Sequence, residues 1–459
     1  MFEKVLVANR GEIAVRVIRA CHDLGIKAVA VHSEADSTSL HCRIADEKVC
    51  IGEAASKSSY LDVPSILSAA EITKCDAIHP GYGFLSENAT FADVCASVAR
   101  TFIGPPASAI RLMGDKAAAR SAMIRAGVPV VPGSEGAARD EAHALSIARE
   151  IGYPVLLKAV AGGGGRGMRV VESEGAFSTL YQTASGEALA AFSNGSLYVE
   201  KFLSETRHVE IQIFADAHGN VVHVGERDCS LQRRHQKLVE ESPSPALSDA
   251  TRDQMGAAAI LAARSAGYVG AGTVEFLLDR TGKFFFIEMN TRIQVEHPVT
   301  EELYGVDLVQ EQLKVASGER LSFTQDVTRT RRGHVMEFRV NAEDPDKDFM
   351  ANPGTISSLV LPGGPGVRVD THVYAGYSVP PFYDSLIGKL IVRGATRELA
   401  FQRAERALSE FEVEGIKTTI PFHRRLLRHP DFKAGKVHTK WVERTMAELA
   451  APAAVGARA

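Results

Sequence analysis

Two glutamates on the arms of an expected hairpin carry the strongest chemical signal in this sequence. In residues 273–287, the segments TVEFLL and FFFI are rich in β-branched and aromatic side chains and flank the turn-forming DRTG, which predicts a β-hairpin. If Leu278 pairs with Lys283, Glu275 lies diagonal to Glu288, and diagonal backbones are about 7–8 Å apart. Converging carboxylates form a hard oxygen site that suits Mg²⁺ better than zinc.

Polar residues continue this pattern beyond the second glutamate. If the strand stays extended, Glu288, Asn290, Arg292 and Gln294 point to one face, because side chains alternate along a strand. A solvent-facing polar strand is the alternative, but residues 294–298 (QVEHP) offer no repeating exposed face. We therefore expect the Asn290 amide oxygen to join the two carboxylates at a magnesium site.

A glycine-rich segment, GGGGRG at residues 162–167, lies between expected strands at residues 154–160 and 168–171. It matches the GxGxxG spacing, but a strand follows it, so no helix N-terminus is present to bind a pyrophosphate, and it lacks the Gly-Lys-Ser/Thr of a P-loop. We expect a flap whose backbone N–H groups cover phosphates, with Lys158 beside it as a positive charge. A flexible surface hairpin is the alternative.

A densely basic segment, RDCSLQRRHQK, occupies residues 227–237. It could be a solvated edge of the protein. Because it lies between two candidate active strands, anion binding is favoured. Cys229 within it is either a reactive thiol or, as we expect, a bystander.

A glycine-containing loop, HPGYGFLSEN at residues 79–88, follows an expected strand. Ligands of α/β sheets bind beyond the carboxyl ends of the strands, so Tyr82 and Glu87 are candidates to face a ligand. A plain structured loop is the alternative. Upstream, a strand at residues 4–8, a helix at 12–24 and a strand at 27–32 predict a βαβ unit, whose turn lacks the dinucleotide fingerprint.

The bulk composition is that of a soluble globular protein. The 459 residues suggest about three domains, and 45% are hydrophobic and 24% charged. The net charge of −4 gives no electrostatic reason to expect nucleic acid or an anionic membrane as partner. No apolar run approaches the roughly 18 residues of a membrane helix, and the N-terminus lacks a signal peptide's apolar core. Six cysteines without a CxxC pair predict reduced cytoplasmic thiols and no zinc site.

Seven motifs, in order along the chain to about residue 445, resemble those of biotin carboxylases, which are ATP-grasp enzymes. They are ANRGEIA (8–14), HPGYGFLSEN (79–88), KAVAGGGGRGMR (158–169), RDCSLQRRHQK (227–237), EMNTRIQVEHPVTE (288–301), RVNAEDP (339–345) and PPFYDSLIGKL (380–390). The sequence departs from the family pattern at Ala161, where members often have glycine, and at Pro365, where a larger apolar residue is usual.

The resemblance implies an α/β and α+β architecture built on the ATP-grasp fold. The expected parts are an N-terminal Rossmann-like domain at residues 1–114, an ATP-grasp domain at 115–330 with a mobile lid at 131–203, a mixed α/β C-terminal domain at 331–446, and a flexible Ala-rich tail at 447–459 that matches nothing in the family.

The resemblance also implies roles for individual residues. ATP would be bound by Lys116, Lys158, Gly163, Gly164, Gly165, Glu200, Lys201, Leu203, His208, Gln232, His235, Lys237, Glu275 and Glu288. Mg²⁺ or Mn²⁺ would be held by Glu275, Glu288 and Asn290. Bicarbonate would be bound by Lys237, Arg292, Gln294, the backbone of Val295 and Glu296, and biotin by Tyr82 and Arg339. The catalytic residues would be Glu296 as general base, Arg292, Lys237 and Arg339.

The implied activity is ATP-dependent carboxylation of biotin, with bicarbonate activated as carboxyphosphate, as the first half-reaction of acetyl-CoA carboxylase in fatty acid biosynthesis. A propionyl-CoA-type carboxylase and a different ATP-grasp ligase remain as alternatives, since the sequence does not identify the final acceptor. A non-catalytic nucleotide-binding subunit is disfavoured by six intact charged residues: Lys116, Lys158, Glu275, Glu288, Arg292 and Glu296. No Met-Lys-Met biotin-attachment tripeptide occurs in the sequence. We therefore expect biotin to arrive on a separate carrier protein, carboxyltransferase subunits as further partners, a homodimer, and a cytoplasmic location.

Overall fold

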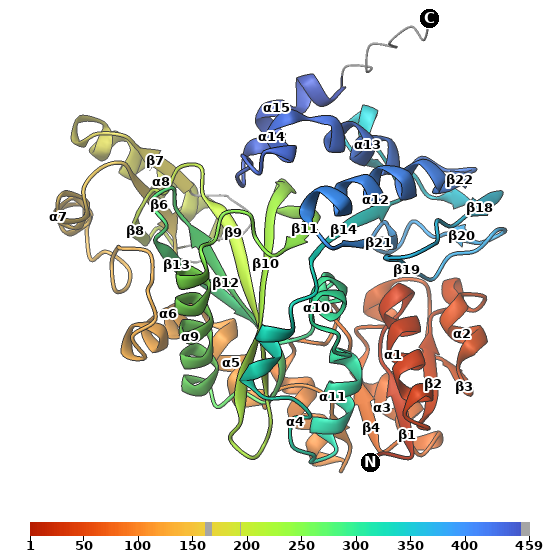
Figure 1. Cartoon of the computed structure of the whole chain (residues 1–459). Helices are drawn as coiled ribbons and strands as arrows, with labels where there is room; N and C mark the ends of the chain where they lie inside the picture. Colours follow the sequence, from red (N-terminus) through yellow and green to blue (C-terminus); the bar gives the residue numbers. More distant parts are fainter. Residues whose placement is uncertain (161–167, 193, 451–459) are drawn as a thin grey trace, which may run out of the picture.

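The computed structural model describes residues 1–160, 168–192 and 194–450 (Figure 1). The N-terminal part contains β1 (Lys4–Val7), α1 (Gly11–Asp23), β2 (Lys27–His32), α2 (Leu40–Ile44), β3 (Glu47–Cys50), α3 (Val63–Ile72), β4 (Ala77–His79), α4 (Ala89–Ser97), β5 (Thr101–Phe102) and α5 (Ala107–Gly114). Its strands form a parallel sheet in the order β3-β2-β1-β4-β5. The predicted βαβ unit is confirmed, with α1 shifted by one residue.

The middle of the chain supplies a separate small sheet and most of a large one. Its elements are α6 (Lys116–Arg125), α7 (Glu141–Ile151), β6 (Val155–Ala159), β7 (Met168–Val171), α8 (Phe177–Phe192), β8 (Leu197–Lys201), β9 (Arg207–Ala215), β10 (Val221–Arg233), β11 (Gln236–Ser242), α9 (Asp249–Ser265), β12 (Gly270–Leu278), β13 (Phe284–Asn290), α10 (His297–Tyr304) and α11 (Leu308–Ala316). The antiparallel sheet β7-β6-β8, with α7 and α8, forms a lobe at the upper left of Figure 1.

The C-terminal part contains β14 (His334–Asn341), β15 (Glu343–Asp344), β16 (Met350–Ala351), β17 (Gly354–Thr355), β18 (Ser358–Val360), β19 (Val367–Thr371), β20 (Ser378–Val379), β21 (Leu386–Gly394), α12 (Arg397–Glu410), β22 (Glu412–Glu414), α13 (Ile420–Arg428), α14 (Pro430–Lys433) and α15 (Trp441–Ala450). Strands β14, β21 and β19 extend the large sheet, whose order is β13-β12-β9-β10-β11-β14-β21-β19. Because β11 pairs with β14, this sheet runs across the boundary expected near residue 330. The domain limits themselves stay predictions.

Apolar side chains hold these layers together. Alanines along α9, among them Ala259, Ala262 and Ala263, pack with Ile211 and Phe276 of the large sheet. Short side chains let the helix approach the sheet closely and remove apolar surface from water. Of the helices in the described ranges, none has the length and apolarity needed to cross a membrane.

The hairpin predicted from residues 273–287 is present as β12 and β13, but its predicted register is wrong. Leu278 pairs with Phe284 rather than Lys283, because the Asp279 amide donates to the Lys283 carbonyl and closes a longer turn. A bulge at Ile287 then adds one residue to the second strand. As a result Glu275 lies directly opposite Glu288 instead of diagonal to it. Directly opposed residues of an antiparallel pair project to the same face, so the two carboxylates face one site.

Arg10 of the first βα turn forms a buried ion pair within the N-terminal part and stacks on a tyrosine of the C-terminal part. Arg10 Nε lies 2.6 Å from Asp36 Oδ2, and the guanidinium stacks 4.1 Å from the ring centre of Tyr383. Burial alone would raise the pKa of Asp36, but the hydrogen bonds and charge of Arg10 lower it to about 2. A carboxylate with a lowered pKa stabilises the fold above its unfolded pKa, and that stability is lost as pH falls towards the folded value.

Asp36→Asn is therefore expected to lower the free energy of unfolding by about 2 kcal/mol or more at pH 7. The difference from wild type should shrink between about pH 4 and pH 2, where wild-type Asp36 itself becomes protonated. Urea denaturation at pH 7 and pH 3 measures this. Asp93→Asn, which breaks the exposed pair with Arg111, is the control and should change little. A destabilisation by Asp36→Asn that is equal at both pH values would contradict the assignment.

Candidate active site

The opposed glutamates form the acidic end of the site. Glu275 is 5% exposed, and its Oε1 accepts from the Asn290 side chain at 2.9 Å. Glu288 is half-buried and makes no ion pair within the described residues. Burial raises the pKa of Glu288, and the charge of Glu275 raises it further while Lys116 opposes this. Excess negative charge at two opposed carboxylates suits a divalent cation, so the residues fit the expected Mg²⁺.

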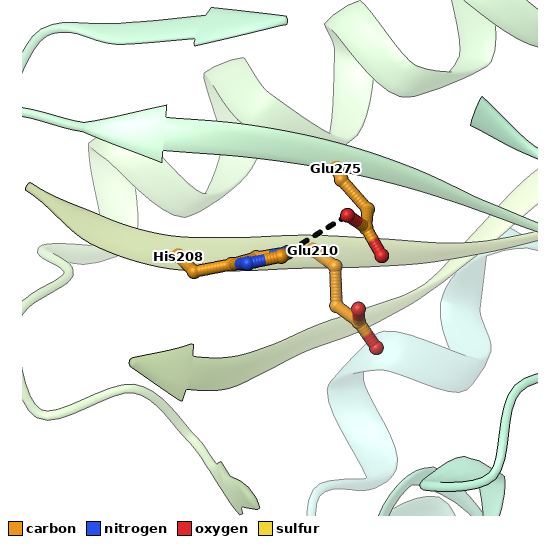
Figure 2. A group of neighbouring side chains, drawn as sticks. All are labelled: His208, Glu210 and Glu275. Atoms are coloured by element: carbon orange, nitrogen blue, oxygen red, sulfur yellow. Dashed lines mark ion pairs between the residues drawn. The ribbon is translucent and has the colours of Figure 1, made fainter. Parts of the chain in front are cut away.

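Figure 2 shows a second set of potential metal ligands beside these glutamates. His208 and Glu210 lie two residues apart on β9 and face Glu275 of β12, with ligand atoms within 4.8 Å of one another. His208 Nε2 is 3.0 Å from Glu275 Oε2. The ammonium of Lys237 already forms ion pairs with both carboxylates, at 2.6 Å from Glu210 and 3.0 Å from Glu275. The lysine already supplies a positive charge to this set, so Glu275 and Glu288 are the better pair of residues to hold a divalent cation.

Lys237 is the central cation of the site. Besides Glu210 and Glu275, its Nζ donates to Glu296 Oε1 at 2.6 Å. Its side chain is 12% exposed. Burial would lower the pKa of Lys237, but the three carboxylates outweigh burial and hold the pKa well above its usual value. The lysine therefore stays charged at any physiological pH.

Glu296 links this lysine to the C-terminal part of the sheet. It is fully buried at the start of α10, and its Oε2 accepts from Arg339 Nη2 at 2.9 Å. Arg339 Nε also donates to the buried Glu240 at 2.7 Å. Burial would raise the pKa of Glu296, but Lys237 and Arg339 hold it well below its usual range. Without substrates Glu296 is a carboxylate.

The polar residues after β13 do not form an extended face, because the strand ends at Asn290. They converge through a loop instead. Arg292 Nη2 donates to Asn290 Oδ1 and Nη1 to Gln294 Oε1, each at 2.9 Å, and Gln294 Nε2 is 3.3 Å from Glu275 Oε1. Arg292 also pairs with Glu87 at 2.9 Å. The predicted bicarbonate residues thus lie next to the predicted metal residues, although the Asn290 oxygen faces Arg292.

Other predicted nucleotide residues lie on the small sheet and around it. Lys158 of β6 pairs with Glu200 of β8. The ammonium of Lys201 donates to the Gly152 and Tyr153 carbonyls at 2.9 Å, so it holds the lobe together. Leu203 follows β8 and Lys116 begins α6. Gly163, Gly164 and Gly165 lie outside the described residues.

The basic segment 227–237 consists of the end of β10, a turn and the start of β11. Gln232 lies opposite Lys237 across β10 and β11. His235 is in the left-handed region with φ of 66°, next to Arg234 at 47°. Such values cost energy for residues with a side chain and persist where surroundings hold them. Here Glu443 accepts from the Arg234 amide at 2.8 Å.

The loop at residues 79–88 forms one wall of the site. Asn9 Nδ2 donates to the Pro80 and Tyr82 carbonyls at 2.7 Å. A Cβ at Gly81, which has φ of 62°, would meet Asn9 Nδ2 at 3.0 Å, so glycine is required there. The hydroxyl of Tyr82 donates to Glu12. Both ligand candidates in this loop, Tyr82 and Glu87, therefore contact charged protein groups.

Five residues of this network were given no individual role from the sequence. They are Glu12, Glu210, Arg227, Glu240 and Lys389. Glu210 and Gln212 alternate with apolar residues in β9, which is a usable signal for one polar face. Arg227, fully buried, donates to Glu210 at 2.5 Å and to Gln212 at 2.7 Å. A fully buried arginine looks the same as an exposed one in a sequence.

Cys229 shows no sign of being a reactive thiol. Each of the six cysteines is free, and Cys229 is fully buried. Burial, with Glu210 adding to it, raises the pKa of Cys229 well above its usual value. A thiol that resists ionisation is a poor nucleophile.

Comparison with known families covers almost the whole chain. Residues 1–110 match the biotin carboxylase N-terminal domain, residues 115–324 the ATP-binding domain of the carbamoyl-phosphate synthase L chain, and residues 337–444 the biotin carboxylase C-terminal domain. The biotin carboxylase of Nostoc sp. is 58% identical over 96% of this chain and 99% of its own length. Biotin carboxylase 1 of Bacillus subtilis is 56% identical over 96% of this chain and 98% of its own.

Similar solved structures belong to the same family. The biotin carboxylase–β-γ-ATP complex from Campylobacter jejuni is 49% identical with a TM-score of 0.89, covering 97% of this chain and 99% of that one. The biotin carboxylase domain dimer of Hydrogenobacter thermophilus 2-oxoglutarate carboxylase, in complex with MgADP, ADP and bicarbonate, is 49% identical with a TM-score of 0.90 over 99% of both chains. The expected ATP-grasp fold with an N-terminal Rossmann-like domain is thereby confirmed. With three matching domain families and relatives above 50% identity, this chain belongs to the biotin carboxylase family.

Proposed function

We propose that this enzyme uses ATP to join bicarbonate to the γ-phosphoryl group, giving carboxyphosphate, and passes the carboxyl group to N1′ of biotin on a carrier protein. The observation that carries the proposal is Lys237, whose ammonium contacts Glu210, Glu275 and Glu296 together. It joins the cation-binding glutamates to the residues proposed for bicarbonate. The phosphoryl donor and its acceptor would therefore meet at one buried positive charge.

Preorganised charges supply most of the help that phosphoryl transfer needs. Glu275 and Glu288 would hold the divalent cation, which when bound neutralises charge on the nucleotide phosphates. Lys237 stabilises negative charge on the transferred group from the other side. Arg292, fixed by Glu87 and Gln294, presents a planar fork for bicarbonate, and such a fork binds two oxygens at once.

Glu296 would be the general base. Its lowered pKa makes it a weak base while Lys237 and Arg339 both contact it. Substrate anions compete for the same two cations, so their binding weakens both contacts and raises the basicity of Glu296. The base is therefore strengthened only when bicarbonate and nucleotide are present.

Arg339 would act in the second step. Carboxyphosphate breaks down to CO2 and phosphate, the phosphate takes the N1′ proton of biotin, and Arg339 stabilises the resulting enolate. N1′ of the enolate then attacks CO2, which forms the N–C bond of carboxybiotin. The guanidinium is held by Glu240 and Glu296 on either side, so it needs little reorganisation for this role.

Partners and location follow the same proposal. A biotin carboxyl carrier protein brings the substrate, carboxyltransferase subunits consume the product, and the chain acts as a cytoplasmic homodimer within acetyl-CoA carboxylase. Similar structures come from 2-oxoglutarate carboxylase and pyruvate carboxylase, so the same half-reaction serves other acceptors in those proteins. Co-purification of the carrier protein decides which acceptor applies here. The domain limits at residues 114, 330 and 446, and the lid at 131–203, are part of this proposal.

Release of ADP by the purified chain tests the function. It is expected to require Mg²⁺ and bicarbonate and to rise when free biotin is added. Turnover that requires bicarbonate but ignores biotin would favour another ATP-grasp ligase. Turnover that requires neither would overturn the proposal.

A further inference from the structure

A fully buried lysine joins three distant parts of the chain beside the active site. Lys389 of β21 is 0% exposed, and its Nζ donates to the Val295 carbonyl at 2.8 Å. The same Nζ lies 3.1 Å from Glu12 Oε1 of α1. The ammonium thus links the C-terminal strand, the loop before α10, and the first helix.

Glu12 extends this link to the biotin side of the site. Its Oε1 accepts from the Tyr82 hydroxyl as well as lying next to Lys389. Its Oε2 is buried and has no hydrogen-bond partner among the described residues. One carboxylate oxygen therefore holds both the lysine and the tyrosine.

The carbonyl of Val295 belongs to the peptide that also contains the Glu296 amide. Fixing that peptide fixes the backbone at the start of Glu296, the proposed base, and at Val295, the proposed bicarbonate contact. Burying a lysine has a large desolvation cost unless it is paired. Its neighbours Leu390 and Ile391 in β21 are apolar and buried, so packing alone does not require an ammonium here.

We propose that Lys389 and Glu12 form a positioning pair that holds the bicarbonate-binding backbone at residues 295–296 and the Tyr82 hydroxyl in fixed relation to each other. This inference rests on the proposed function for the identity of the two ligands. Neither residue touches a reacting atom. The bridge acts by keeping the two substrate sides of the pocket aligned across three segments of the chain.

Lys389→Met keeps the aliphatic stem and removes the donor to Val295. The KM for bicarbonate is expected to rise about tenfold, the loss expected when one hydrogen bond to a charged donor is removed. The dissociation constant for MgADP should stay within twofold, because no nucleotide residue contacts Lys389. Hydrogen–deuterium exchange should become faster in residues 291–296 and 80–84.

Lys389→Met also leaves the Glu12 charge unpaired, so lost stability has to be separated from lost positioning. The double variant Lys389→Met, Glu12→Gln removes both charges and should regain most of the thermal stability, yet keep the raised KM for bicarbonate. Arg397→Met is the matched control, since Arg397 pairs with the buried Glu241 at 2.8 Å on another face of the same sheet. It should lose stability without changing the KM or the exchange of residues 291–296.

Either of two results would overturn the inference. One is a bicarbonate KM within twofold of wild type together with unchanged exchange at residues 291–296 in Lys389→Met. The other is the same kinetic and exchange change in Arg397→Met, which would mean general destabilisation. If the wild-type chain shows no bicarbonate-dependent ADP release, the proposed function fails, while the exchange measurement still decides whether Lys389 positions this loop.

Discussion

Lys237→Met is expected to lower kcat for bicarbonate-dependent ADP release by about 10³ or more. Removing one preorganised donor typically costs about 10²–10³ in rate. Lys237 contacts Glu210, Glu275 and Glu296. Without its positive charge, these three buried carboxylates would repel one another. Removing one partner of a buried ion pair lowers the free energy of unfolding by roughly 3–5 kcal/mol. The midpoint of thermal unfolding should therefore fall together with the rate.

Single-turnover measurement of ADP release at saturating MgATP and bicarbonate, with thermal unfolding in parallel, tests this expectation. Lys4→Met is the control, because it removes a lysine paired with Glu47 at 2.7 Å in the N-terminal sheet, away from the site. It should keep both kcat and KM. A Lys237→Met variant that folds and retains a tenth of wild-type kcat would remove Lys237 from the catalytic residues.

The sequence predicted the elements better than their exact pairing. The aromatic segment before Glu288 and the turn at Asp279–Gly282 are local signals, and the hairpin they predict is present. The register is not local. It depends on the turn closed by Asp279 and on a bulge that leaves Ile287 38% exposed, and β12 is at the same time paired with β9 on its other side.

The basic segment 227–237 shows a second limit. Its sequence does not separate Lys237, proposed to contact substrate anions, from Arg227, which donates to protein side chains in a strand buried along almost its whole length. Strands covered on both faces lose the alternation that separates inside from outside. The partner of Arg227, Glu210, lies on a neighbouring strand, and no spacing within the segment reveals it.

Contacts between residues far apart in the sequence were the hardest to predict. Lys389 and Glu12 are 377 positions apart, and the position of neither residue suggests the other. The family resemblance supplied the residues expected to contact substrates. It did not supply the protein groups that hold them, because those form only when β21, α1 and the loop before α10 come together.

Buried charges of alternating sign form one continuous row of ion pairs, contributed by β9, β10, β11, β14 and the start of α10: Arg227, Glu210, Lys237, Glu296, Arg339 and Glu240. Each contact along the row is 2.9 Å or shorter. Apolar residues of the same size would often be at least as stable, so stability alone does not explain the row. Its charges are oriented before substrate binds, and fixed charges of this kind stabilise anionic transition states without reorganisation.

Arg339→Ala is expected to lower biotin-dependent ADP release by about 10²–10³, since it removes the donor proposed for the biotin enolate. ADP release without biotin should fall much less, because Lys237 and Arg292 still act on bicarbonate and the γ-phosphate. Burial and the loss of Arg339 together should also raise the pKa of Glu240, which is about 7 with the arginine present, so Glu240 becomes neutral and limits the loss of stability.

Comparison of ADP release with and without free biotin separates the two steps. Arg425→Ala is the matched control, because it breaks a pair with Asp346 at 3.0 Å in the same C-terminal part without touching the row of charges. It should leave both rates unchanged. Equal losses with and without biotin in Arg339→Ala would place the arginine in the first step, acting through Glu296, instead of on biotin. Biotin-dependent activity within threefold of wild type would exclude Arg339 from catalysis. Of the charges in the row, only those up to Glu296 could then take part in the reaction.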